Sequence, residues 1–179
     1  PHIHHIKVIE NKVHVLTHEG LFELVAKNDM KLVGKDRIDV MGFTSLGKVL
    51  FASGHPAKGS KMPNPIGLVK SIDGGLTWKA VSLVGKVDFH FLEGAGTDLY
   101  GSDSQSGNLM YSPDSGKTWK YLGTNTFTDI AVSPKMPGMA LAIKNSELLL
   151  TKNAFKATTK LKIASKLPKL SGVNRGSMG

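Results

Sequence analysis

The sequence contains no cysteine among its 179 residues, so disulfide bonds and thiolate chemistry are excluded, and cysteine usage says nothing about the redox compartment. Arginine is nearly absent as well, because Arg37 and Arg175 are the only two. No apolar run approaches the roughly 18 residues that a membrane-spanning helix needs, and the longest candidates, such as residues 147–151, have the length of a strand. No segment shows a helical period of apolar residues. We therefore expect an all-β chain without a transmembrane segment.

The formal net charge of +9 comes from lysines that are scattered along the chain rather than clustered. Nucleic-acid binding favours arginine forks, basic clusters and stacking aromatic residues, and aromatic residues make up only 7% of this sequence. Scattered lysines instead predict a solvated surface. We therefore expect no nucleic-acid partner.

One pattern of eight residues occurs twice. Residues 71–78 and 112–119 both read S-x-D-x-G-x-T-W, and apolar segments of strand length precede and follow each copy. In such a turn the aspartate accepts hydrogen bonds from nearby backbone N–H groups, the glycine tolerates a positive φ and the tryptophan is an apolar plug. We therefore assign a structural role to Ser71, Asp73, Gly75, Thr77 and Trp78 and to Ser112, Asp114, Gly116, Thr118 and Trp119.

The distance between the two copies predicts the architecture. A repeat of about 40 residues made of short strands is typical of a β-propeller blade. The strands align into four four-stranded units, at about 1–36, 37–85, 86–124 and 125–164, and the turn at 151–158 is a degenerate copy with Asn153 in place of the aspartate. Residues 165–179 are a tail or the start of a missing blade.

Four blades are fewer than the six or seven, roughly, that such propellers usually have. We therefore predict an incomplete or truncated propeller: a fragment, a shortened relative, or half of a ring that a second copy completes as a homodimer.

The histidines fall on one side of this predicted ring. The face opposite the repeated turns collects the starts of the first strands and the ends of the second strands of the blades. His2, His4, His5 and His90 lie at starts, His18 and His55 lie at ends, and only His14 points to the other face.

Converging imidazoles favour transition metals. We predict a zinc or copper site with ligands from His2, His4, His18, His55 and His90. Asp39, Met41 and Asp88 would be further ligands or acceptors that orient the rings. Two alternatives remain open: a metal-free polar binding pocket, and histidines that only fill a polar channel.

Several segments together resemble a known family. They are His2-Ile-His4, Thr17-His18-Glu-Gly20-Leu-Phe22, Met41-Gly-Phe43, Ser53-Gly-His55-Pro56, Asn64-Pro-Ile-Gly67-Leu and Asp88-Phe-His90. In this order they resemble the secreted bacterial BNR or Asp-box repeat proteins, which are labelled glycosyl-hydrolase-like or exo-sialidase-like. The resemblance implies a β-propeller and an extracytoplasmic location. His5 stands where that family has glycine.

These observations favour a binding function. We predict a secreted propeller module that binds a metal ion, a small polar ligand, a glycan or a protein partner through its histidine face. The alternative is a glycoside hydrolase-like enzyme that acts on extracellular glycans. Sialidase chemistry needs an arginine triad to hold the substrate carboxylate, and Arg37 is the only arginine in the repeats.

Other glycosidases need two carboxyl groups facing each other across the sugar. Asp39, Asp88 and Asp103 are available on the histidine face. No spacing selects an acid and base among them, so the catalytic residues are unassigned.

Overall fold

The computed structural model describes residues 2–162, which form strands and turns and no helix. Sixteen strands build four antiparallel sheets of four strands each, and each sheet follows the order of the chain. Blade 1 comprises β1 (Ile3–Ile9), β2 (Lys12–Thr17), β3 (Gly20–Ala26) and β4 (Asp29–Leu32); blade 2 comprises β5 (Asp39–Leu46), β6 (Val49–His55), β7 (Leu68–Ser71) and β8 (Lys79–Ser82). Blade 3 comprises β9 (Phe89–Ala95), β10 (Asp98–Asp103), β11 (Asn108–Ser112) and β12 (Lys120–Thr124); blade 4 comprises β13 (Asp129–Val132), β14 (Ala140–Lys144), β15 (Glu147–Thr151) and β16 (Thr159–Lys160).

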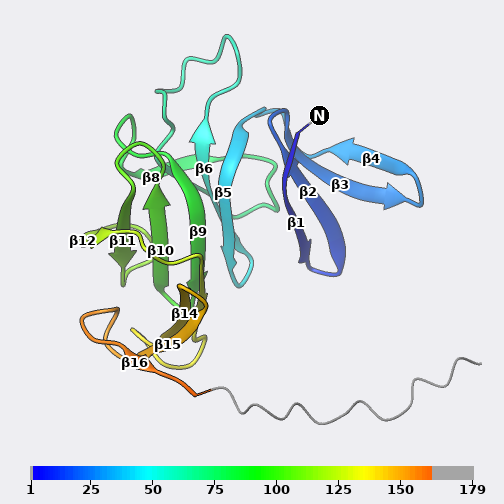
Figure 1. Cartoon of the computed structure of the whole chain (residues 1–179). Helices are drawn as coiled ribbons and strands as arrows, with labels where there is room; N and C mark the ends of the chain where they lie inside the picture. The colour runs from blue at the N-terminus through cyan, green and yellow to red at the C-terminus, as the bar shows by residue number, and fades with distance from the viewer. Residues whose placement is uncertain (1, 163–179) are drawn as a thin grey trace, which may run out of the picture.

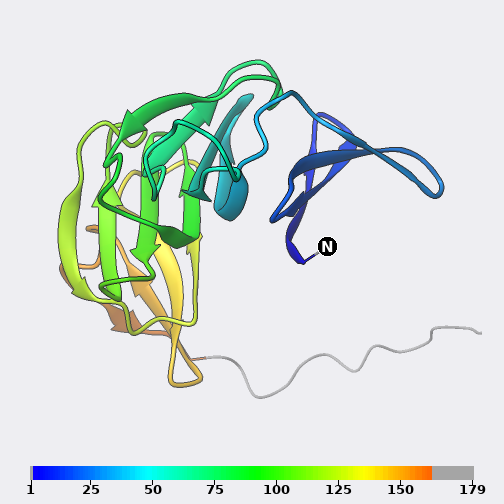
Figure 2. The ribbon, with the colours of Figure 1, turned by 90° about the horizontal axis from the view of Figure 1, so that it is seen from above.

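The four blades stand side by side along an arc that does not close (Figures 1 and 2). The first strands of neighbouring blades contact one another, with β5 between β1 and β9, and β9 between β5 and β13. The fourth strands β4 and β12 lie toward the outside of the arc (Figure 1). The predicted all-β class and the count of four blades are confirmed, and the open arc agrees with an incomplete propeller. The described residues include no helix that could span a membrane.

One apolar cluster fills each interface between blades. Leu16 and Leu21 of blade 1 pack with Phe43 of blade 2. Phe51 of blade 2 packs with Phe89 of blade 3 in the second cluster. The third cluster joins blades 3 and 4 and includes Tyr100, Tyr111, Ile130 and Ala142. The core is therefore a row of interfaces, and each blade depends on its neighbour to bury its apolar face.

The two repeated turns form the same hydrogen bonds. The hydroxyl of Ser71 accepts a bond from Gly75 N–H at 2.8 Å, and Asp73 accepts bonds from Thr77 N–H at 3.0 Å and Thr77 Oγ1 at 2.6 Å. In the second turn the corresponding distances are 2.8, 2.9 and 2.7 Å for Ser112, Asp114, Gly116 and Thr118. The side chains of both turns therefore stabilise the backbone of the turn itself, which is a structural role.

The fourth blade keeps this turn with a different sequence. Thr151 Oγ1 accepts a bond from Phe155 N–H at 2.9 Å, and Asn153 Oδ1 accepts one from Ala157 N–H at 2.9 Å. Phe155 occupies the glycine position with a φ of 62°, and its ring meets Tyr100 edge-to-face and packs against Phe127 at a tilt. The asparagine oxygen thus replaces the carboxylate for one of its bonds.

Candidate metal centre

Six of the seven histidines lie on the face of the blades at which the first strands begin and the second strands end. Five of them belong to two clusters, and His5 belongs to neither. One consists of His2, His4 and His18, and the other of His55, Asp88 and His90; within each, one ligand atom per residue lies within 4.8 Å of the others. We name the second cluster the blade 2/3 site, because His55 ends β6 of blade 2 while Asp88 and His90 open blade 3. The first, with Asp39, is the blade 1/2 site.

The carboxylate of Asp88 is the centre of the blade 2/3 site. Its Oδ2 lies 2.8 Å from His90 Nε2 and 3.3 Å from His55 Nε2, and Ser104 Oγ donates a hydrogen bond to the same oxygen at 2.8 Å. Asp88 is 2% exposed, whereas the side chains of His55 and His90 are 35% and 44% exposed. The carboxylate therefore lies at the buried base of the site, and the two rings lie on its solvent-exposed side.

Backbone contacts fix the position of Asp88. Its N–H donates to Asp103 Oδ1 at 3.0 Å, and its carbonyl accepts a bond from Ser104 N–H at 2.9 Å. Burial by itself raises the pKa of Asp103, but hydrogen bonds from Ser106 and from the Asp88 backbone outweigh it and lower that pKa. Asp103, one of the carboxylates considered for catalysis, thus anchors the backbone of Asp88, immediately before β9.

The charge of Asp88 lacks an ordinary counter-ion. Within the described residues its ion-pair partners are the two histidines alone, and its Oδ1 is buried without a hydrogen-bond partner. A buried carboxylate is costly unless it is paired and hydrogen-bonded. A buried oxygen of this kind retains the capacity to accept a hydrogen bond from water or to bind a cation.

The amide of Asn64 determines how His55 faces this carboxylate. His55 Nδ1 donates to Asn64 Oδ1 at 2.8 Å, so the neutral ring carries its proton on Nδ1 and presents a lone pair at Nε2. That lone pair lies 3.3 Å from Asp88 Oδ2. Two lone pairs at this distance require a cation between them, either a proton or a metal ion.

The donor set fits a transition metal. Around a tetrahedral zinc ion with bonds of about 2.0–2.2 Å, neighbouring ligand atoms lie about 3.3–3.6 Å apart. The distances from Asp88 Oδ2 to the two imidazole nitrogens, 2.8 and 3.3 Å, reach this range with small shifts of the exposed rings. Among the transition metals, zinc and copper both accept a ligand set of two imidazoles and one carboxylate.

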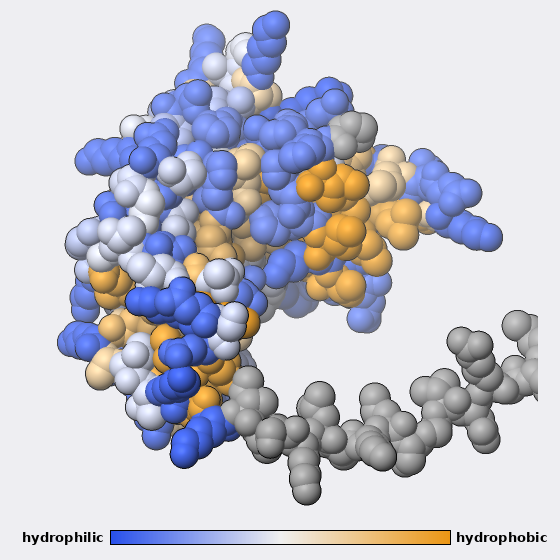
Figure 3. Space-filling model, viewed as in Figure 1, coloured by the Kyte–Doolittle hydropathy of each residue, from blue (hydrophilic) through white to orange (hydrophobic). Residues whose placement is uncertain are grey.

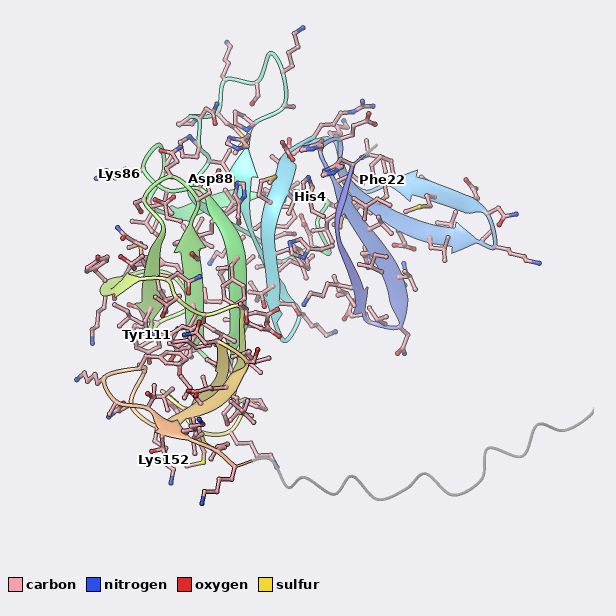
Figure 4. All side chains as sticks on the ribbon, viewed as in Figure 1. His4, Phe22, Lys86, Asp88, Tyr111 and Lys152 are labelled. Carbon is pink, nitrogen blue, oxygen red and sulfur yellow. The ribbon has the colours of Figure 1, made fainter. Side chains whose placement is uncertain are left out.

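The blade 1/2 site has a similar geometry. His18 Nδ1 donates to Asp39 Oδ1 at 2.8 Å, and His4 Nε2 lies 3.3 Å from His18 Nδ1 and 3.7 Å from Asp39 Oδ1. The ring of His2 stacks on His18 with centroids 5.2 Å apart. Burial, and next the charge of His18, lower the pKa of His4. Figure 4 places His4 on the blade 1 side of β5 and Asp88 on the blade 3 side.

The remaining predicted residues lie near these sites in other roles. His5 Nε2 donates to the carbonyl of Met41 at 2.8 Å, so the contact that the structure shows for Met41 is through its backbone. His14 lies on the opposite face, as expected, and lines a cavity together with Asp73 and Gly74 of the first repeated turn. The sequence analysis assigned no site role to Asn64 or Ser104; Asn64 appeared only within the family-like segment Asn64-Pro-Ile-Gly67-Leu, nine residues after His55.

One sizeable cavity lies away from the six histidines of this face. It has a volume of about 810 Å³ and lies between the outer strands of blade 1 and the first repeated turn, with Val25, Leu32, Lys35, Leu76 and Thr77 among its lining residues. It gathers no set of imidazoles and carboxylates like those of the two clusters, so we place the chemistry at the histidine face.

Comparison with known proteins supports the fold. No model of a protein family and no curated protein matches the sequence. Among solved structures, a GH74 enzyme of Niastella koreensis superposes with a TM-score of 0.58 at 13% identity over 89% of this chain and 29% of its own. An ancestral GH74 enzyme gives 0.56 at 12% identity over 85% and 23%.

A third solved structure, YCF48 bound to D1 peptide, gives a TM-score of 0.52 at 15% identity over 92% of this chain and 54% of its own. The chain thus spans less than a third of either GH74 enzyme and about half of YCF48. At these identities the likeness concerns the fold alone. Residues 2–162 thus form four blades of a β-propeller fold.

Proposed function

We propose that this protein is a β-propeller binding module that holds a zinc or copper ion through His55, Asp88 and His90. The observation that carries the proposal is the buried carboxylate of Asp88, which has only histidines as ionisable partners in the described residues and one oxygen without a partner. A divalent cation would neutralise this charge and satisfy the lone pair of His55 Nε2.

Each residue of the site has a defined task. Asp88 supplies the negative charge, and the rings of His55 and His90 supply nitrogen lone pairs on the solvent side. Asn64 holds the tautomer of His55, and Ser104 holds Asp88 Oδ2. When bound, a metal with three protein ligands keeps a position for water or a small polar ligand and polarises it as a Lewis acid.

Glycan hydrolysis, binding of a protein partner and an extracytoplasmic location, which the sequence also suggested, have less support than metal binding. The likeness to GH74 enzymes concerns the fold and does not favour glycan hydrolysis by this chain. Binding of a protein partner, for which the YCF48–D1 peptide complex is a precedent in a related fold, is compatible with the same module. The extracytoplasmic location rests on the family resemblance alone.

The test is titration of chelator-treated protein with Zn²⁺ by isothermal calorimetry. We expect the variants Asp88→Asn and His55→Ala/His90→Ala each to lose about one equivalent of Zn²⁺ relative to the unsubstituted protein. Asp29→Asn, at an exposed position of β4, is the matched control and retains it.

Circular dichroism shows whether each variant keeps its strands. A second readout, the visible spectrum of the Co²⁺ complex, reports the coordination sphere directly. An unchanged stoichiometry and an unchanged Co²⁺ spectrum in folded Asp88→Asn and His55→Ala/His90→Ala would overturn the proposal.

A further inference from the structure

We propose a second metal site, one blade earlier, in which His4, His18 and Asp39 hold a divalent transition-metal ion across the interface of blades 1 and 2. This inference stands on its own contacts and does not rest on metal binding at the blade 2/3 site. The two sites are tested separately below.

The strand register shows that the two sites occupy equivalent positions in successive blades. In blade 2, Asp39 pairs with His55 across β5 and β6. In blade 1, Ile3 pairs with Thr17. One residue beyond this pair, His2 corresponds to Asp39 and His18 corresponds to His55. In blade 3, Phe89 pairs with Asp103, so Asp88 corresponds to Asp39 and Ser104 corresponds to His55; the backbones of Asp88 and Ser104 are hydrogen-bonded at 2.9 Å.

The same contact therefore crosses both interfaces. His18, which follows the second strand of blade 1, lies 2.8 Å from Asp39, which opens blade 2. His55, which ends the second strand of blade 2, lies 3.3 Å from Asp88, which precedes the first strand of blade 3. In each case a histidine from one blade meets an aspartate from the next.

The third ligand comes from the later blade in the blade 2/3 site and from the earlier blade in the blade 1/2 site. In the blade 2/3 site it is His90, two residues after Asp88. The corresponding residue after Asp39 is Met41, whose carbonyl is bonded to His5. His4, which holds this same position in blade 1, supplies the missing nitrogen instead, because its Nε2 reaches both His18 Nδ1 and Asp39 Oδ1.

The spacing of these three atoms suits a metal ion. The distances of 2.8, 3.3 and 3.7 Å bracket the separation of about 3.3–3.6 Å between ligands of a tetrahedral zinc ion. The side chains of His4 and Asp39 are only 11% and 21% exposed, while His18 is 47% exposed. The ring of His2 stacks on His18, so a further imidazole is within reach of the ion.

An ion at this site would join two blades. His4 and His18 belong to blade 1, which ends the arc (Figure 2), and Asp39 belongs to blade 2. An ion that binds only the assembled site stabilises that assembly by mass action. Zn²⁺ should therefore hold blade 1 against blade 2, beside the bond from His5 to the Met41 carbonyl.

The experiment compares paired variants of the whole chain by calorimetric titration with Zn²⁺ and by amide hydrogen exchange. We expect about two equivalents of Zn²⁺ for the unsubstituted protein and about one for either His4→Ala/His18→Ala or His55→Ala/His90→Ala. Zn²⁺ should slow exchange in β1 and β2 of the protein that retains His4 and His18, including His55→Ala/His90→Ala, and should not do so in His4→Ala/His18→Ala.

Two further variants guard against unfolding as an explanation. Asp39→Asn keeps both rings and should weaken Zn²⁺ binding at this site by about tenfold or more. Asp29→Asn, at an exposed position of β4 in the same blade and away from the site, should keep both equivalents. If His55→Ala/His90→Ala binds no Zn²⁺, or if His4→Ala/His18→Ala loses none, the second site is refuted. If the unsubstituted protein binds one equivalent and His55→Ala/His90→Ala still binds it, only the proposed function is refuted.

Discussion

At the scale of single residues, the amide of Asn64 controls the chemistry of a histidine in the same blade. Its Oδ1 accepts a hydrogen bond from His55 Nδ1 at 2.8 Å, and this bond leaves the Nε2 lone pair facing Asp88. The ring that binds a metal usually donates its other N–H to such an acceptor, which fixes the tautomer and strengthens the ligand. In the proposed site, metal binding by His55 would therefore depend on a residue that is not itself a ligand.

We expect Asn64→Ala to weaken Zn²⁺ binding at the blade 2/3 site by about 10–100-fold without removing it, because all three ligands remain. Asn64→Asp, which keeps an acceptor oxygen, should bind as the unsubstituted protein does or more tightly. Competition with a chelator of known affinity measures both. Equal affinities for Asn64→Ala and the unsubstituted protein would contradict this role for Asn64.

At the scale of the elements, the repeated turns are small hydrogen-bonded units that also form the contact between blades. The bonds from Thr77 and Ser71 lower the pKa of Asp73 to about 2, and those from Thr118 do the same for Asp114. The glycine of each turn faces the preceding blade: a Cβ on Gly75 would lie 2.4 Å from Leu21 Cδ2. One short motif therefore shapes the turn and admits the neighbouring blade.

The lowered pKa values predict how these turns respond to acid. Because the folded-state pKa lies below the ordinary value of 3.8, the stabilisation is present above about pH 4 and is lost as pH falls toward about 2. Asp114→Asn cannot accept both threonine bonds, so it should lower the Tm at pH 7 by a few degrees, and the difference should shrink toward pH 2. Thermal scans across this range, with Asp29→Asn as control, measure it. A difference that does not change with pH would contradict the assignment.

Adjacent glycines separate backbone strain from packing between blades. Gly74 and Gly75 both have positive φ, 72° and 93°, but a Cβ on Gly74 meets nothing within 4 Å. Gly74→Ala should cost only the strain of the left-handed region, about 1–2 kcal/mol. Gly75→Ala should cost about 1–3 kcal/mol more, because the added methyl overpacks the interface with blade 1.

Urea unfolding of the two alanine variants measures this difference. Equal free energies of unfolding would show that the interface yields freely at Leu21.

At the scale of the whole molecule, the arc leaves an apolar face at each end. In blade 1, Ile6 and Val8 are 64% and 71% exposed, and Figure 3 shows a hydrophobic patch over β1. In blade 4, Leu141 and Ile143 are 36% and 40% exposed and border a cavity of about 130 Å³. Inner blades bury such faces against a neighbour.

We therefore expect this chain of 179 residues to self-associate as its concentration rises, as the predicted homodimer requires. Light scattering with size separation measures the mass. Replacing Ile6 and Val8 by threonine should shift the equilibrium toward monomer, whereas Ile72→Thr, at a residue 70% exposed in the first repeated turn, should not. A monomeric mass at every concentration would contradict the expectation.

The sequence by itself determined what depends on local and periodic chemistry. The turn residues, the alternation of the strands and the repeat length are local, so they were enough for the all-β class, the four blades and the end of the ring that carries the histidines. Even the degenerate turn at Asn153 could be located, because an amide oxygen can replace the carboxylate in accepting Ala157 N–H.

Only the tertiary structure decided how the histidines are grouped. Their division into two clusters, the choice of His4 rather than Met41 beside Asp39, and the support from Asn64 and Ser104 all depend on how one blade stacks on the next. Residues such as His4 and Asp39 meet through space across a packed interface, and their separation in sequence carries no record of that contact. The physical reason is that strand periodicity sets which face a side chain occupies, whereas packing between blades sets which side chains on that face come within bonding distance.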